Sequence, residues 1–167
     1  PVRKATEDLQ NDLTKVFGVR PRIVTRAEDA GAVTIMIGEN SELPAAMRPT
    51  NLGAPESFSI SVAQTHGKSP SRVVLLAGAD MRGTMYAIYQ FSQDYLGVDP
   101  MYYWTDKQPA RRARIEIPAG LAHAFPAPLY KYRGFFINDE DHRTGWAPGE
   151  KTDKTGISLA VMNKIYE

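Results

Sequence analysis

Residues 72–97, RVVLLAGADMRGTMYAIYQFSQDYLG, determine the fold predicted for this chain. The stretch opens with an apolar run, which is typical of a central strand covered on both faces. Helical spacing then brings Met85, Ile88 and Tyr95 onto one stripe, and Asp80 is placed to cap the first helical turn. The stretch therefore predicts a strand that turns directly into a helix lying on the same sheet.

The segments before this stretch predict further parts of the same domain. Residues 2–17 place apolar side chains at helical spacing and end before Gly18, a helix stop. Residues 32–38 form a β-branched run that suits an interior strand, whereas residues 57–62 alternate Ser with apolar residues, as a half-buried strand does. Shorter extended segments are predicted at residues 22–25, 101–105 and 113–117, with one turn at 45–47. The predicted fold class is α/β, a small sandwich built on a mixed sheet.

A second domain is predicted after a linker. Residues 118–130 contain three prolines and one glycine. These residues interrupt any apolar spacing typical of a strand or a helix. Residues 131–137 are typical of a buried strand, and residues 157–167 start an amphipathic helix. One strand and one helix cannot bury their own apolar faces, so we expect residues 131–167 to be the first unit of a larger second domain. The predicted division is residues 1–117, a linker at 118–130, and the truncated start of a second domain at 131–167.

The composition limits the kinds of partner. The 167 residues carry a formal net charge of +1, which leaves no overall field to attract nucleic acid or a membrane surface. The chain has no Cys, so disulfides, thiolate metal sites and cysteine nucleophiles are excluded. His66, His123 and His142 lack metal-ligand spacing, and no phosphate-binding or dinucleotide fingerprint is present. We therefore expect no metal, no cofactor, no nucleic acid and no membrane as partners.

Three stretches carry a resemblance to a known family: Glu56-Ser57-Phe58, residues 77–106, and residues 132–141, YRGFFINDED. Together they are similar to glycoside hydrolase family 115, the xylan α-1,2-glucuronidases. In that family an N-terminal α/β domain precedes a (β/α)8 barrel and further C-terminal domains. The resemblance therefore implies that residues 131–167 are the truncated start of such a barrel. The resemblance implies that the full protein removes α-1,2-linked glucuronic acid, or its 4-O-methyl ether, from glucuronoxylan with inversion.

The resemblance also implies a setting for that reaction. The partner would be xylan or xylo-oligosaccharide carrying glucuronic acid, and the location extracellular or periplasmic. Dimer formation, if it occurs, would use domains outside this chain. An inverting mechanism needs two carboxyl groups roughly 6.5–9.5 Å apart. We expect this acid and base on later barrel strands, so that the chain alone is inactive.

The substrate-binding residues are predicted at the end of the barrel strand. Asn138, Asp139 and Glu140 follow the apolar run, and side chains at the carboxyl end of a barrel strand reach the active site. Trp146 lies in the next loop and offers an aromatic face to a sugar ring. The alternative is that the polar cluster caps backbone groups and pairs with neighbouring arginines, and that the Trp is a packing anchor. We predict sugar contact, and not proton transfer, for this group.

Other interpretations stay open. The chain is alternatively a stand-alone α/β accessory or carbohydrate-binding module, or part of another barrel glycosidase such as a hexosaminidase or a family 67 glucuronidase. An autonomous module should not end on an exposed apolar helix face, which favours the hydrolase. Residues 80–84 resemble an anion site at a helix N-terminus, but a structural turn explains them with fewer assumptions. Arg111, Arg112 and Arg114 are predicted to form a solvated turn.

Overall fold

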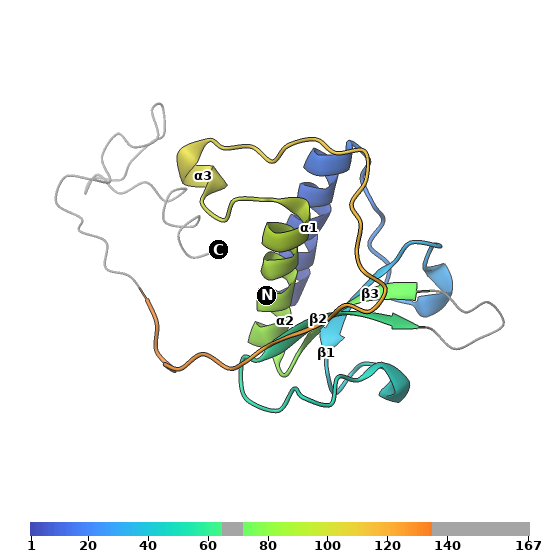
Figure 1. The fold of residues 1–167 in the computed structure, drawn as a ribbon, viewed down its shortest axis with the longest axis vertical. Helices are drawn as coiled ribbons and strands as arrows, with labels where there is room; N and C mark the ends of the chain where they lie inside the picture. The colour runs from blue at the N-terminus through green and yellow to red at the C-terminus, as the bar shows by residue number, and fades with distance from the viewer. Residues whose placement is uncertain (65–71, 135–167) are drawn as a thin grey trace. The chain divides into compact units, whose positions relative to one another are not determined.

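The computed structural model describes residues 1–64 and 72–134 (Figure 1). The chain divides into two units, Pro1–Leu129 and Tyr130–Glu167, and the elements named here all belong to the first. Its main helices are α1 (Val2–Phe17) and α2 (Met81–Phe91), the latter continued by a π-helical turn, η3 (Ser92–Leu96). The strands are β1 (Ile35–Glu39), β2 (Phe58–Gln64), β3 (Arg72–Gly78) and β4 (Ala122–Phe125). Shorter helical segments are η1 (Ala27–Asp29), η2 (Ala45–Met47) and α3 (Tyr102–Thr105).

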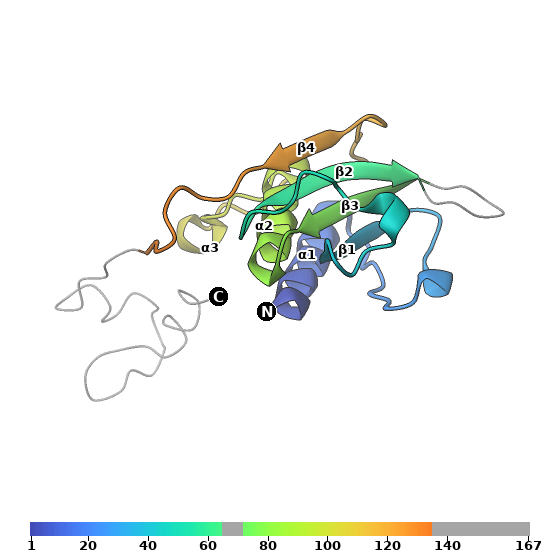
Figure 2. The same ribbon diagram turned by 90° about the horizontal axis from the view of Figure 1, so that it is seen from below.

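The strands form one mixed sheet in the order β1-β3-β2-β4 (Figure 2). β1 pairs with β3 in parallel, with Ile37 opposite Leu76. β2 is antiparallel to both of its neighbours, and its Ile60 lies opposite Leu76 on one side and His123 on the other. The predicted α/β class with a mixed sheet is confirmed, as is the central position of the strand at residues 72–77.

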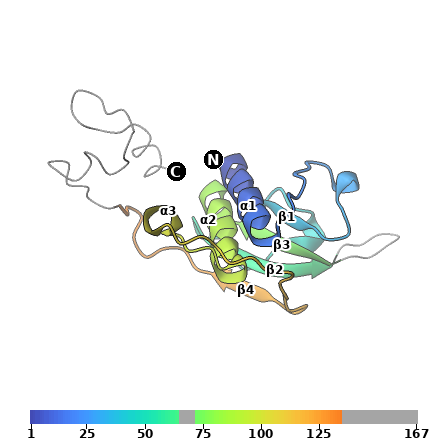
Figure 3. The same cartoon turned by 90° about the horizontal axis from the view of Figure 1, so that it is seen from above.

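One face of the sheet is covered by α1 and α2, which lie side by side on it (Figures 2 and 3). Ile60 and Leu76 from neighbouring strands meet Ala5, Ile88 and Phe91 from the helices, and all five are fully buried. Burying a side chain as large as Ile, Leu or Phe contributes about 1.5–3 kcal/mol. The stripe predicted on α2 is therefore the face that anchors this helix.

The opposite face of the sheet is covered by irregular chain. Leu43 and Leu52, from the connection between β1 and β2, pack on Leu75 and Ala77 of β3. Alternate residues of β3 thus point into two separate apolar clusters. This double coverage explains why the sequence of β3 is an unbroken apolar run.

The prediction of an interior strand at residues 32–38 is wrong, because β1 lies at an edge of the sheet. Ile35 and Ile37 pack towards the helix layer, while Met36 packs towards the cluster on the other face. An apolar run indicates that both faces of a strand are covered. It carries no information on whether both edges are paired.

Two further segments predicted to be extended pair with no described strand. Residues 22–25 follow Pro21 and stay exposed. Residues 113–117 run past the helix layer, where Ile115 and Ile117 pack against its core. The apolar and polar alternation of residues 113–117 reflects one-sided burial, and such burial does not require a neighbouring strand.

Residues 101–105 were expected to be extended, but α3 forms there instead. A carboxylate oxygen of Asp99 accepts a hydrogen bond from the backbone N–H of Met101 at 2.9 Å. The N–H of Tyr102 also donates to the carbonyl of Asp99 at 2.9 Å. This local turn outweighs the strand preference of the aromatic residues that follow.

β4 lies inside the segment predicted to be a linker without a strand period, so that prediction is wrong for residues 122–125. Phe125 stacks on Phe58 of β2, with 4.4 Å between the ring centroids. Pro118 and Pro126 lie outside β4, where their missing N–H groups cost the ladder nothing. The domain limits stay a prediction, and the expected barrel strand end and helix at residues 135–167 lie outside the described residues.

α2 approaches the start of β2 so closely that only glycine fits at position 83. A Cβ on Gly83 would lie 2.4 Å from the carbonyl oxygen of Ser57, whereas nothing lies within 4 Å of the same position on Gly53. We expect Gly83→Ala to lower the free energy of unfolding by about 3 kcal/mol, because the helix or strand must shift. Gly53→Ala is the control and should change it by less than about 0.5 kcal/mol. Urea denaturation measures both, and a wild-type midpoint for Gly83→Ala would contradict the close approach.

Candidate functional site

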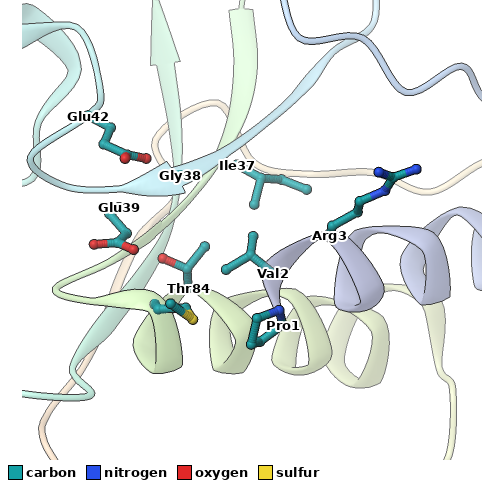
Figure 4. Close-up of a pocket in the computed structure, with 9 residues that line it drawn as sticks. Pro1, Val2, Arg3, Ile37, Gly38, Glu39, Glu42 and Thr84 are labelled. Atoms are coloured by element: carbon teal, nitrogen blue, oxygen red, sulfur yellow. The ribbon is translucent and has the colours of Figure 1, made fainter.

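The parallel strands β1 and β3 end at the edge of the sheet where α1 and α2 begin (Figure 4). Glu39 and Gly78 are partners at the ends of these strands, and β2 starts opposite Gly78 with Phe58. In open α/β sheets, ligands bind outside the carboxyl ends of the parallel strands. This edge is therefore the candidate site of the first unit.

Asp80 joins α2 to the chain that precedes β2. One carboxylate oxygen accepts a hydrogen bond from the backbone N–H of Gly83 at 2.8 Å, and the other accepts from the N–H of Glu56 at 2.9 Å. The negative charge lies at the helix N-terminus, where the helix dipole favours it. The predicted capping role of Asp80 is confirmed, and the same side chain also fixes the residue two before β2.

Glu56 is held in an uncommon backbone conformation at this junction. Its φ is 65°, in the left-handed region that few non-glycine residues adopt. Its carboxylate accepts from Arg82 at 2.8 Å and from the hydroxyl of Tyr86 at 3.5 Å. The Arg82 side chain is 64% exposed, against 11% for that of Glu56. Solvent therefore screens the pair, and its contribution to stability is modest.

The anion site considered for residues 80–84 does not match this geometry. The N–H of Gly83 is bonded to the Asp80 carboxylate, and the N–H of Thr84 donates to the Asp80 carbonyl at 2.9 Å. Two of the amide groups at this helix N-terminus, those of Gly83 and Thr84, thus already have partners within the chain. The geometry therefore supports the interpretation of these residues as a structural turn.

A pocket of about 340 Å³ lies beside the junction. Figure 4 shows the carboxylates of Glu39 and Glu42 on the β1 side of it and Thr84 on the α2 side. The Thr84 hydroxyl donates to the Asp80 carbonyl at 2.9 Å, so it belongs to the turn. The guanidinium of Arg3 pairs with Glu7 along α1 at 3.1 Å. Two carboxylates are thus the main chemical groups that line this pocket.

Within residues 1–64 and 72–134, no three His, Cys, Asp or Glu side chains come together in a way that could hold a metal ion. No described helix combines the length and apolar character needed to cross a bilayer.

Asp99 and Tyr95 have shifted pKa values, and both lie at the other end of α2 from the pocket. The N–H of Met101, helped by the Lys107 ammonium at 3.3 Å, holds the pKa of the Asp99 carboxyl below its usual value. Burial, helped by the charge of Asp94, raises the pKa of the Tyr95 hydroxyl. Local hydrogen bonds and packing account for both shifts, so neither marks a reaction centre.

The residues predicted to bind substrate belong to the C-terminal stretch of the sequence. Asn138, Asp139, Glu140 and Trp146 all lie outside the described residues, and their roles stay predictions. Sequence analysis selects Glu56 only through the family resemblance and assigns it no role. A positive φ at a glutamate leaves no signal in the sequence, so its place in the junction emerges only from the structure.

Comparison with known proteins gives one kind of match. No protein family model matches the chain, and no curated protein matches it. Among solved structures, the chain is similar to a family GH115 4-O-methyl-α-glucuronidase with specificity for decorated arabinogalactans. The sequences are 25% identical and the TM-score is 0.70. The match covers 93% of this chain and 20% of that protein.

The chain has a GH115-like fold. This likeness agrees with the mixed sheet and its helix layer, which suit the α/β domain expected at the N-terminus of such a protein. The chain spans only about a fifth of the length of the solved structure it matches. The likeness therefore concerns architecture over nearly all of this chain and a small part of the hydrolase.

The junction makes a prediction about stability. Asp80→Ala removes a helix cap and leaves the N–H of Glu56 unsatisfied, so we expect the free energy of unfolding to fall by about 2–4 kcal/mol. Arg82→Ala removes only a solvated ion pair and should cost less than about 1 kcal/mol. Asp94→Ala, an exposed aspartate on η3, is the matched control. Urea denaturation measures the three variants. A larger loss of unfolding free energy in Arg82→Ala than in Asp80→Ala would show that the ion pair, and not the helix cap, stabilises the junction.

Proposed function

We propose that this chain is the N-terminal part of a glycoside hydrolase that removes α-1,2-linked glucuronic acid, or its 4-O-methyl ether, from glucuronoxylan with inversion. The observation that carries the proposal is the match of 93% of the chain to a GH115 4-O-methyl-α-glucuronidase at a TM-score of 0.70. The motif resemblance at residues 56–58 and 77–106 supports it independently. A polymeric substrate of this kind suits an extracellular or periplasmic protein.

In this proposal the described α/β unit has a structural role, and the catalytic acid and base lie elsewhere in the full protein. Inversion needs an acid and a base whose carboxyl groups lie roughly 6.5–9.5 Å apart across a space that admits sugar and water. The Asp80 and Glu56 carboxylates instead accept hydrogen bonds from groups of this unit. We assign the acid and base to later strands of a barrel that begins near residue 131.

The proposed substrate contacts are Asn138, Asp139, Glu140 and Trp146. A hydroxyl-rich sugar is recognised through hydrogen bonds to amide and carboxylate groups, and each such bond to a charged group contributes about 1.5–3 kcal/mol. The indole of Trp146 would supply an apolar surface for one ring face. These residues position the uronosyl unit in the proposal and transfer no proton.

The test is an assay of the full-length gene product on glucuronoxylan, with uronic-acid-decorated arabinogalactan as a second substrate. We expect release of glucuronic acid or its 4-O-methyl ether from glucuronoxylan, with NMR showing the inverted anomer first. Asp139→Ala and Glu140→Ala should each lower kcat/KM by about tenfold or more, the equivalent of one lost charged hydrogen bond. Asp29→Ala and Glu116→Ala, exposed acidic residues of the first unit, serve as matched controls.

The possible outcomes separate the parts of the proposal. Release from arabinogalactan alone would keep the glucuronidase activity and overturn the xylan assignment. Wild-type kcat/KM in both acidic variants would overturn the substrate contacts and leave the activity standing. No uronic acid from either polymer would overturn the function.

A further inference from the structure

A strap, defined as residues 106–121, crosses the carboxyl ends of the two main helices before the chain enters β4 (Figure 1). The last carbonyl groups of a helix have no partner within it and need donors from outside. α1 and the α2–η3 helix both end at this level, at Gly18 and Gly97. The strap therefore passes over two sets of carbonyl oxygens that need hydrogen-bond donors.

Arg112 supplies donors to both helix ends. Its backbone N–H donates to the carbonyl of Val16, in the last turn of α1, at 2.9 Å. Its guanidinium donates to the carbonyl of Tyr95, in the last turn of η3, at 3.3 Å. A positive charge at this position also complements the negative end of the helix dipoles.

The two terminal glycines make room for two consecutive arginines. Gly18 and Gly97 have φ values of 74° and 69°, so both helices end in a left-handed glycine. A Cβ on Gly18 would lie 2.7 Å from Nη1 of Arg111, and a Cβ on Gly97 would lie 2.7 Å from Nη2 of Arg112. Each guanidinium thus occupies the space that a Cβ would fill if the glycine at that helix end were replaced by another residue.

The strap continues from these contacts to the sheet. Ile115, Ile117 and Leu121 pack against the core of the helix layer. The carbonyl of Leu121 then accepts a hydrogen bond from the N–H of Val62 in β2 at 2.9 Å, immediately before β4 begins. One continuous segment therefore links the helix ends to the outermost strand.

We infer that Arg111 and Arg112 form an arginine clamp that fixes the strap over both helix ends and thereby holds β4 on the edge of β2. Both side chains are exposed, as expected for a solvated turn, and their guanidinium groups also lie against the helix ends. Arg114 is different, because it pairs with Glu116 at 3.0 Å and both side chains are about four-fifths exposed, at 81% and 79%. The clamp is a structural feature that stabilises the fold, and it does not depend on the proposed hydrolase activity.

Amide hydrogen exchange tests whether the clamp holds β4. The N–H of Val62 reports on the strap, while the N–H of Val74, which donates to the carbonyl of Thr34 at 3.1 Å, reports on the β1 side of the sheet. In Arg111→Ala/Arg112→Ala we expect exchange at Val62 to accelerate at least tenfold and at Val74 less than threefold. Arg114→Ala is the matched control and should leave both rates unchanged. Unchanged exchange at Val62, or equal acceleration at both positions, would overturn the inference.

A double-mutant cycle tests the contact between Arg112 and Gly97, using single variants that keep the rest of the clamp. Gly97→Ala places a methyl group where the guanidinium lies. Left-handed backbone strain at position 97 is present in both backgrounds, so we expect the effect of Gly97→Ala on the unfolding equilibrium constant to be smaller, but not abolished, in the Arg112→Ala background, where there is no guanidinium to displace. Equal effects of Gly97→Ala in the two backgrounds would overturn the clamp.

Discussion

The hydrogen bonds to the Asp80 carboxylate fix the geometry on which the first unit depends. Because one oxygen binds the start of α2 and the other binds the backbone before β2, the helix cannot slide along the strand without losing both contacts. Gly83 lets the two backbones approach closely enough for this arrangement. Once the start of α2 is fixed, Ile88 and Phe91 face Ile60 and Leu76 in the core. The polar junction sets the register, and apolar burial then supplies most of the stability.

The parts of the fold that sequence analysis predicts correctly are those with local signals. The period of 3.6 in α1 and α2, the alternation in β2 and the apolar run of β3 each report on burial within one element. Apart from α3, where a local turn at Asp99 replaces the expected extended segment, the errors concern pairing between distant residues. Residues 122–125 form β4 because Phe125 stacks on Phe58 of β2. β1 is an edge strand because no described strand pairs with its outer side. Neither outcome is determined by the residues of those segments alone.

The same distinction between local signals and contacts of distant residues applies to the candidate site. Asp80 carries a recognisable helix-capping signal, and its role was predicted from the sequence. Glu56 depends on a backbone conformation, and Arg112 depends on two helix ends that are distant in the sequence from it and from one another. A short basic cluster in a sequence is most often solvated, so only the positions of the helix ends distinguish Arg112 from Arg114. The substrate contacts proposed at residues 138–140 rest on family resemblance, and the GH115-like fold supports that resemblance.

The short length of β4 has a consequence for the behaviour of the protein in solution. An edge strand exposes unpaired N–H and C=O groups that can recruit a strand from another molecule, which is a common route to aggregation. β4 limits this hazard, because it has only four residues and Pro118 and Pro126 stand close to its two ends without N–H groups to donate. A neighbouring chain that paired with β4 could form only about one or two hydrogen bonds before it reached positions without free N–H groups. The prolines that make this strand hard to predict from the sequence also limit intermolecular pairing at the β4 edge of the sheet.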